Sequence, residues 1–195
     1  MVHVRRVIAL LGLLVAATLV GVLDAGGAYA STPQCAPGAL TSYGASSDIF
    51  FARHVLVPGT SVHAEVVSIN TTLYAGDHIY DGPADLVMQS DGNLVVYGIL
   101  ARTVGCEADW ASNTYHLPTA AQPFQQAVLD TAGNFYLQIA PQNSYHSIYS
   151  CGSQPTSICN HNYEILAVQD DGNVVLYNTY YTPWHAEWAT NTAWF

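Results

Sequence analysis

The sequence predicts an all-β protein assembled from internal repeats, and two observations lead to this prediction. The stretch Gln89–Tyr97 returns eighty residues later as Gln169–Tyr177, with Gln, Asp, Asn, Val and Tyr recurring at alternate positions. The chain is also rich in Tyr, Asn, Thr and Ser but only 9% charged, which is typical of a β-rich protein rather than of a disordered chain. We therefore expect hairpins of short strands.

Each copy of this stretch predicts a β-hairpin. The Asp91-Gly92 pair marks a turn between two runs of alternating residues. Because side chains alternate between the two faces of a strand, a three-residue loop, 91–93, keeps Gln89 and Tyr97 on the same face. We call this polar face the first shelf; it consists of Gln89, Asp91, Asn93, Val95 and Tyr97. The opposite face carries an apolar stripe suited to a core, made of Leu86, Met88, Leu94 and Val96.

The second copy repeats this chemistry on the second shelf, which consists of Gln169, Asp171, Asn173, Val175 and Tyr177. Each shelf offers two amides, a carboxylate and a phenol around one isopropyl group, and no base, nucleophile or metal-binding cluster lies among them. The hydroxyls of a sugar, each both donor and acceptor, complement such a surface. The valine can contact the apolar face of the sugar ring. These side chains could instead be ordinary solvent-facing strand residues, but two matching copies favour a binding site.

Both copies match the pattern Gln-x-Asp-x-Asn-x-Val-x-Tyr at every position, and they are flanked by Leu73–Asp77, Trp110–Thr114 and Trp188–Thr192. In these features the chain resembles the bulb-type, or monocot mannose-binding (B-type), lectins from about residue 70 onward. The resemblance implies a β-prism II of three four-stranded antiparallel sheets from three internal repeats. It also implies a mannose site on each sheet that keeps the pattern. In that family the last strand is often exchanged with a neighbouring chain, so the resemblance allows a homodimer.

A middle repeat, Asp130–Gln138, lies between the two copies, with its asparagine 41 residues after Asn93 and 39 residues before Asn173. Its apolar stripe is kept as Ala127, Leu129, Phe135 and Leu137. Its shelf is lost, because four of the five positions are replaced, by Asp130, Ala132, Tyr136 and Gln138. Asn134 alone is kept. We therefore expect the middle repeat to be retained for folding and lost for sugar binding.

Two tryptophans stand at matching places after the two copies, Trp110 and Trp188. Large aromatic side chains dominate protein cores, so we expect both to fill the axial core where the sheets meet. Stacking on a sugar is the less favoured interpretation.

Three segments are predicted along the chain. Residues 1–30 are predicted to be a secretory signal peptide, because Arg5 and Arg6 precede an apolar run that ends at the small-residue cleavage site 28–30. That run is short for a membrane span, so we expect a secreted, extracellular protein that begins at Ser31 and is not inserted in a membrane after processing. The alternative is that the run stays uncleaved as a membrane anchor. Residues 31–69 are expected to form an N-terminal extension, partly β, and residues 70–195 the lectin domain.

The charge of the predicted mature chain excludes some partners. Residues 31–195 contain two arginines, no lysine and thirteen acidic residues. A chain with this negative charge repels nucleic acid and anionic lipid, whereas its charge does not oppose the binding of a neutral ligand.

All four cysteines lie after the predicted signal peptide, and an even number in a secreted chain predicts two disulfides. Three pairings are possible, and we favour Cys151–Cys159 with Cys35–Cys106, because the first pair is close enough to staple one loop. Zinc is disfavoured because no Cys-x-x-Cys pairs are present. Calcium is disfavoured because the clustered aspartates lack the ligand spacing of a known loop. The sequence therefore predicts no metal and no cofactor.

An enzyme is not predicted. No Gly-x-Ser-x-Gly context surrounds a serine, and no pair of carboxylates is marked for glycoside cleavage. The favoured function is a secreted lectin that binds mannose or mannose-containing glycans through the two shelves. The alternative is a structural, inhibitory or toxin-like binding protein that keeps the prism but uses another surface.

Overall fold

The computed structural model describes residues 43–47, 49, 51–98, 108–116, 124–139, 144–151 and 162–194. Within these residues the secondary structure consists of strands and one short 3₁₀ helix, η1 (Thr114–His116). No helix in this part of the chain has the length and hydrophobicity needed to cross a bilayer. The predicted signal peptide lies outside the described residues.

The strands form three sheets, and every pairing in them is antiparallel. The first-motif sheet has the order β1 (Tyr43–Ala45), β5 (His78–Asp81), β6 (Ala84–Met88), β7 (Leu94–Tyr97), β8 (Ala108–Ala111). The middle sheet has the order β11 (Ser144–Tyr149), β10 (Phe135–Ile139), β9 (Gln126–Leu129), β4 (Thr71–Tyr74). The second-motif sheet has the order β14 (His185–Ala189), β13 (Val174–Asn178), β12 (Glu164–Gln169), β3 (His63–Ser68), β2 (Arg53–Leu56).

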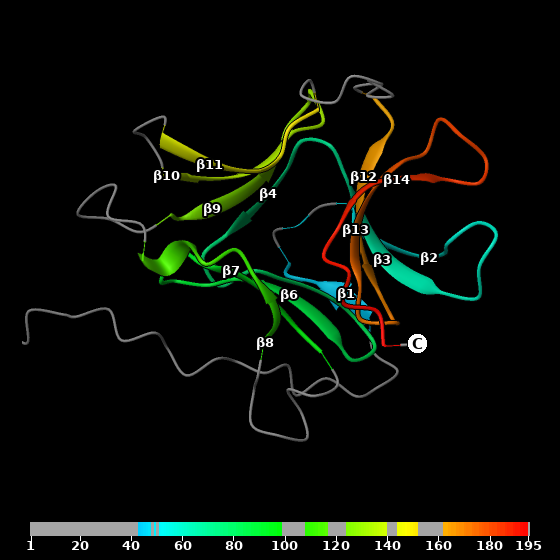
Figure 1. Ribbon diagram of the computed structural model, residues 1–195, viewed down its shortest axis with the longest axis horizontal. Coiled ribbons are helices and arrows are strands. Elements are labelled where there is room, and N and C mark those ends of the chain that lie inside the picture. Colours follow the sequence, from blue (N-terminus) through cyan, green and yellow to red (C-terminus); the bar gives the residue numbers. More distant parts are fainter. Residues whose placement is uncertain are drawn as a thin grey trace, which may run out of the picture.

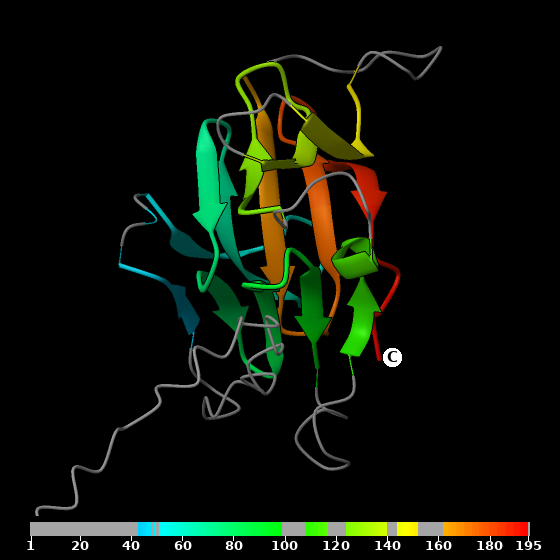
Figure 2. The same ribbon diagram turned by 90° about the vertical axis from the view of Figure 1, so that its left-hand side faces the viewer.

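The three sheets surround a common interior, as Figure 1 shows, and Figure 2 shows β12 and β13 running side by side along the molecule. The predicted all-β prism of three antiparallel sheets is thus confirmed. Two of the sheets have five strands rather than the expected four, because β1 and β2 add to their edges. The segment 31–69, expected as an extension, also supplies β3, which pairs with β12 on one side and β2 on the other.

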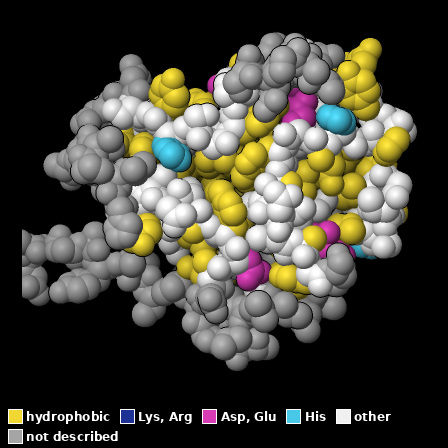
Figure 3. All heavy atoms as spheres, in the orientation of Figure 1, with side chains coloured by type: hydrophobic (Ala, Val, Ile, Leu, Met, Phe, Trp, Pro, Cys, Tyr) yellow, Lys and Arg dark blue, Asp and Glu magenta, His cyan; other side chains and the backbone are white. Residues whose placement is uncertain are grey.

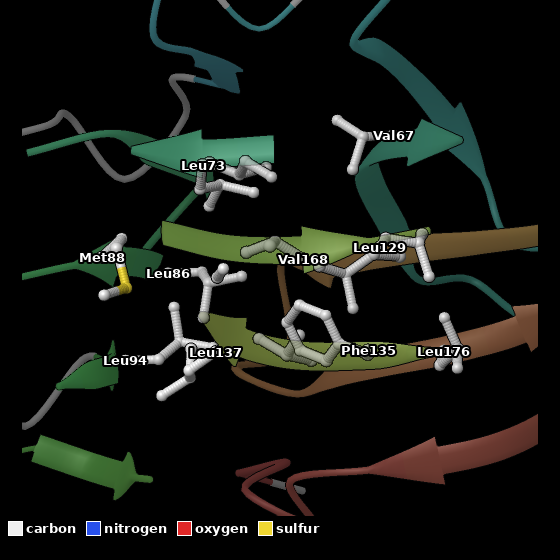
Figure 4. Close-up of a cluster of buried hydrophobic side chains, with 14 of the residues drawn as sticks. Val67, Leu73, Leu86, Met88, Leu94, Leu129, Phe135, Leu137, Val168 and Leu176 are labelled. Carbon is white, nitrogen blue, oxygen red and sulfur yellow. The ribbon is translucent and has the colours of Figure 1, made fainter. Parts of the chain in front are cut away.

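The interior is filled by the predicted apolar stripes. Leu86, Met88, Leu94 and Val96 are at most 1% exposed, as are the middle-repeat side chains Ala127, Leu129, Phe135 and Leu137. Figure 4 shows six of them converging from different sheets on one cluster, namely Leu86, Met88, Leu94, Leu129, Phe135 and Leu137. Fully burying one such aliphatic or aromatic side chain stabilises the fold by roughly 1.5–3 kcal/mol, so the shared stripe explains why all three repeats fold alike.

Two tryptophans meet at this core as predicted. The rings of Trp110 and Trp188 lie 5.6 Å apart in an edge-on arrangement, and both pack, partly buried, against the central cluster. Phe135 of the middle repeat contacts Trp188 at 5.9 Å between ring centroids. The axial-core assignment of these tryptophans is therefore confirmed.

Each repeat turns through a three-residue loop, one residue earlier than predicted. Gln89 N donates to Asn93 O at 2.8 Å, and Gly92 N donates to Gln89 O at 3.0 Å, so the loop is 90–92 and not 91–93. The reason is the backbone of Gly92, whose φ of 88° places it at the left-handed position that closes this loop. The loop still has an odd number of residues, so Gln89 and Tyr97 remain on one face.

Three of the four cysteines, Cys35, Cys106 and Cys159, lie outside the described residues. Cys151 is 2% exposed and is not a free thiol. The pairing of the cysteines therefore stays a prediction.

Candidate functional site

The β6–β7 hairpin brings the five residues of the first shelf together. Gln89 Nε2 donates a hydrogen bond to the hydroxyl of Tyr97 at 2.7 Å, across the two strands. Asp91 Oδ1 accepts a bond from Asn93 N at 3.0 Å, which fixes the carboxylate over the turn. Val95 packs in a small apolar cluster with Tyr97, Val87 and Ala111.

The second shelf has the same internal geometry on the β12–β13 hairpin. Gln169 Nε2 donates to the hydroxyl of Tyr177 at 2.8 Å, and Asn173 N donates to Asp171 Oδ1 at 2.9 Å. Every sequence-predicted shelf residue is therefore in place, and the two sets repeat one another to within about 0.1 Å in these contacts.

The asparagine of each shelf also joins the turn to the segment after the next strand. Asn93 Oδ1 accepts from Ser112 Oγ at 2.8 Å and from Thr114 N at 3.3 Å. Thr114 Oγ1 in turn donates to Gly92 O at 2.6 Å. We call this arrangement the asparagine clip. Thr190 and Thr192 form it around Asn173, with distances of 3.0 and 3.3 Å.

The clip is present in the middle repeat as well. Asn134 Oδ1 accepts from Cys151 N at 3.0 Å and from Ser150 Oγ at 3.4 Å. This explains why Asn134 is the one shelf residue kept there, since the turn needs it whether or not a ligand binds. The clip partners were not predicted from the sequence. The signal for them is the Ser-Asn-Thr and Thr-Asn-Thr segments that follow Trp110 and Trp188.

The two shelves are covered to different extents along their length. Val95 and Val175 are each 2% exposed, so in both shelves the valine is buried. In the first shelf Gln89 and Asp91, near the turn, are half-buried and accessible, whereas Tyr97 is buried. In the second shelf Tyr177 is half-buried, while Gln169 and Asp171 are buried. The more exposed end is therefore the turn end in the first shelf and the phenol end in the second.

The phenols of both shelves act as neutral hydrogen-bonding groups. Burial raises the pKa of the Tyr97 hydroxyl and that of the Tyr177 hydroxyl above the ordinary value. The hydrogen bonds from the side-chain amides of Gln89 and Gln169 lower these pKa values, but by less. Burial also raises the pKa of Asp171, partly offset by the bond from Asn173 N. Each shelf thus presents amides, a phenol and one carboxylate, a set suited to exchanging hydrogen bonds with hydroxyl groups.

The second shelf has an aromatic neighbour that the first lacks among the described residues. The ring of Trp184 lies 5.7 Å from that of Tyr177 and packs against the outer apolar cluster of Val57, Ala64, Val66, Ile165 and Ala167. Trp184 had no assigned place in the sequence, because no pattern position marks it. Its contact arises only when the β13–β14 connection folds over the sheet.

One group of potential metal ligands is present among the described residues. Ligand atoms of Cys151, Glu164 and Glu187 lie within 4.8 Å of one another. Cys151 is not a free thiol and so offers no thiolate, and Glu187 Oε2 accepts a bond from the Tyr149 hydroxyl at 3.0 Å. These residues do not fit a metal centre.

The described residues therefore define a class of protein, a prism of three antiparallel sheets that carries a matching polar shelf on two of them. No protein-family model and no curated protein matches the chain. Solved structures that it is similar to include lectins of three plants.

A lectin from Allium sativum is 32% identical, covering 57% of this chain and 91% of that one, with a TM-score of 0.42. The mannose-specific agglutinin from snowdrop, Galanthus nivalis, solved with methyl-α-D-mannoside, is 26% identical over 65% of this chain and 95% of its own, with a TM-score of 0.43. A monomeric monocot mannose-binding lectin from Gastrodia elata is 24% identical over 66% and 97%, with a TM-score of 0.48. The resemblance to the monocot mannose-binding, or bulb-type, lectins that the two motif copies predicted is confirmed.

Proposed function

We propose that this protein is a lectin that binds mannose or mannose-containing glycans through the first and second shelves. The observation that carries the proposal is that two sets of five residues, eighty positions apart, adopt the same geometry. The snowdrop agglutinin to which the chain is similar was solved with a mannoside, which supports the same class of ligand.

Binding at one shelf is expected to be weak. About four hydrogen bonds to a sugar, each worth roughly 0.5–1.5 kcal/mol after exchange with water, leave a dissociation constant on the order of millimolar once the lost freedom of the ligand is counted. Attachment to a branched or polymeric glycan then depends on both shelves engaging it. Linking two sites can raise apparent affinity by roughly 10²–10⁴ if the geometry permits simultaneous contact.

The surface agrees with an uncharged ligand. On the face shown in Figure 3, most described side chains are hydrophobic or uncharged polar, and the acidic ones lie apart from one another. We further propose that the protein is secreted after loss of residues 1–30, binds neither nucleic acid nor membrane, has no catalytic activity, and can form a homodimer. Intact-mass measurement of the secreted protein, expected to begin at Ser31, tests the first of these. Light scattering tests the last.

The experiment for the shelves uses Asp91→Ala, Asp171→Ala and the double variant, with Ser90→Ala as a control at an exposed turn position. Each single variant should leave binding of free methyl-α-D-mannoside at the other shelf almost unchanged in calorimetry. Each should nevertheless reduce retention on a mannan surface strongly, and the double variant should abolish it. Thermal unfolding is recorded for every variant, because the carboxylate also holds the turn.

A glycan array separates this function from its rival, a structural, inhibitory or toxin-like prism protein that uses another surface. The lectin should bind mannose-bearing glycans on the array. A folded double variant that still holds mannan would place the sites elsewhere and end the shelf proposal.

A further inference from the structure

A pocket opens on the outer face of the second-motif sheet, at the edge formed by β2. Its volume is about 450 Å³, within the roughly 300–1,000 Å³ typical of small-molecule sites. Its lining consists of Phe51, Ala52, Arg53, Val66, Ser68 and Ile165. None of these residues belongs to either shelf, so the pocket is separate from the proposed mannose sites.

The strand register explains the apolar floor of this pocket. Val66 and Ile165 are 1% and 4% exposed, and both belong to the outer apolar cluster. Val66 of β3 stands opposite Arg53 of β2, and Ile165 of β12 stands opposite Ser68 of β3. Arg53 and Ser68 are exposed. The pocket therefore has apolar carbon at its base and two polar side chains at its rim.

Arg53 brings a positive charge that no described acidic residue neutralises. The three ion pairs among the described residues each join an aspartate to a histidine, and none includes Arg53. This is unexpected in residues 31–195, which contain thirteen acidic side chains against two arginines and no lysine. The guanidinium of Arg53 thus keeps its donors for a ligand that enters the apolar pocket beside it.

Phe51 stands at the rim of the pocket in an unfavourable backbone conformation. Its φ is 66°, in the left-handed region that bulky residues avoid, and its side chain is 87% exposed. Backbone strain of this kind is concentrated at functional sites. A ligand seated on Val66 and Ile165 would also contact the ring of Phe51 and remove apolar surface from water.

We infer that this pocket binds a small organic anion that has an apolar body. The body lies against Val66, Ile165 and the ring of Phe51. The anionic group accepts paired hydrogen bonds from Arg53, whose planar guanidinium matches the geometry of a carboxylate. The excess of acidic residues in the chain does not prevent this, because salt screens charges beyond about 8 Å at physiological ionic strength.

The same lining disfavours a sugar as the ligand. Four of the six lining residues are apolar, and the only polar groups among their side chains are one guanidinium and one hydroxyl. Each shelf instead offers two amides, a carboxylate and a phenol. The pocket and the shelves are therefore suited to ligands of different chemistry, and the inference does not depend on the proposed mannose sites.

The test compares ligands that differ in charge and little in shape: 3-phenylpropanoate with 3-phenylpropanamide, and octanoate with octanamide. Ligand-observed NMR titrations at pH 7 measure the affinity of each for the wild-type protein. At least one anion should bind at least tenfold more tightly than its amide, because the amide cannot form the charged pair with Arg53. Added salt should weaken the binding of the anion much more than that of the amide.

Two variants locate the binding. Arg53→Gln should bind the anion and its amide equally, and Phe51→Ala should weaken both about tenfold. Leu56→Ala is the matched control, because Leu56 is 53% exposed on the same strand and does not line the pocket. It should bind both ligands as the wild type does. All three variants should keep the wild-type retention on mannan.

Three results would overturn the inference: neither anion bound by the wild type, equal binding of each anion and its amide, or a preference for the anion that persists in Arg53→Gln. If Arg53→Gln does not fold, the charge comparison in the wild type still decides the matter. The proposed mannose sites fail separately, by loss of mannan binding in the wild type.

Discussion

The two motif-bearing sheets and the middle sheet share one inner face and differ on the outer one. All three place an apolar stripe in the core, turn through a three-residue loop and fasten that loop with an asparagine clip. Outside, the shelves pair valine and tyrosine with alanines, whereas the middle sheet pairs tyrosine with serine and glutamine with tyrosine. Folding therefore sets the inner face and the turn, and leaves the outer face available for binding.

The largest expected effect tests the shared inner face. Phe135 is fully buried in the core beside Trp188, so Phe135→Ala should lower the free energy of unfolding by roughly 3–5 kcal/mol. Tyr145→Ala, on the outer face of the same sheet, should change it by less than about 0.5 kcal/mol. Chemical denaturation measures both. Equal losses of stability would mean that the outer face of the middle sheet contributes as much to folding as its inner face.

The next effect tests whether the asparagine clip is structural in every repeat. Replacing the asparagine leaves one backbone N–H without its acceptor, that of Thr114, Cys151 or Thr192 in the three repeats. The free energy of unfolding should therefore fall by about 1–3 kcal/mol in each of Asn93→Ala, Asn134→Ala and Asn173→Ala. The same denaturation series measures the three variants. An Asn134→Ala protein as stable as wild type would show that the middle repeat keeps its asparagine for another reason.

A smaller, pH-dependent effect concerns the contact between the two motif-bearing sheets. Glu65 of β3 is 3% exposed, and its charge interacts with that of Asp81 on β5. Asp81 lies 3.1 Å from His54, whose ring stacks on that of His63. His63 in turn lies 3.4 Å from Asp170. Burial, and then Asp81, raises the pKa of Glu65 from 4.5 to about 7. Burial raises that of Asp81 from 3.8 to about 6, against the opposing charge of His54.

A raised carboxyl pKa means that the folded protein holds its protons more tightly than the unfolded chain. The resulting stability is fully present below about pH 4 and is lost as the pH rises to about 7. Glu65→Gln should therefore raise the Tm relative to wild type at pH 8 and much less at pH 5. Thermal unfolding at the two pH values measures this. A Tm difference that does not change with pH would exclude Glu65 as the titrating group.

The smallest effect compares the phenols of the two kinds of sheet. Tyr97 is buried, and its hydroxyl accepts a hydrogen bond from the side-chain amide of Gln89. Tyr97→Phe should therefore lower the free energy of unfolding by about 0.5–1.5 kcal/mol. Tyr136 is half-buried and lines a pocket on the outer face of the middle sheet, so Tyr136→Phe should be close to neutral in stability. If the order of the two variants were reversed, the first shelf would be the more open surface.

Much of the fold and of the candidate site could be predicted from the sequence, for local reasons. The alternation of Leu86, Met88, Leu94 and Val96 identifies the core face, and a loop with an odd number of residues keeps Gln89 with Tyr97 even though the loop was placed one residue late. The segment 31–69 was expected to be partly β, and β2 and β3 lie in it, but the edge position of β2 and the strand β1 were not predicted. β1 and β2 are short and weakly patterned, and their pairing depends on sheet edges formed by distant residues.

The C-terminus gives a further example of what sequence pattern does not supply. The segment after β14 crosses to the first-motif sheet, where Trp194 Nε1 donates to Asp109 Oδ2 at 3.1 Å (Figure 1). Trp194 N also donates to Asp171 O at 3.0 Å, and its ring lies so close to Gly172 that an added Cβ would stand 2.3 Å away. No spacing rule relates residue 194 to residue 109, so only the folded chain brings them together.

The sequence by itself determined the repeats, the apolar stripes, the turns and the two five-residue shelves, because all of these follow from alternation and spacing within short stretches of chain. The tertiary structure decided which parts of each shelf are open, what each asparagine fastens, and that the middle sheet holds a pocket on its outer face. These depend on contacts between strands and segments far apart in the chain, such as β10 with β11 and Asn93 with Thr114. Contacts of that kind are fixed by packing around the common core and leave no periodic signal in the sequence.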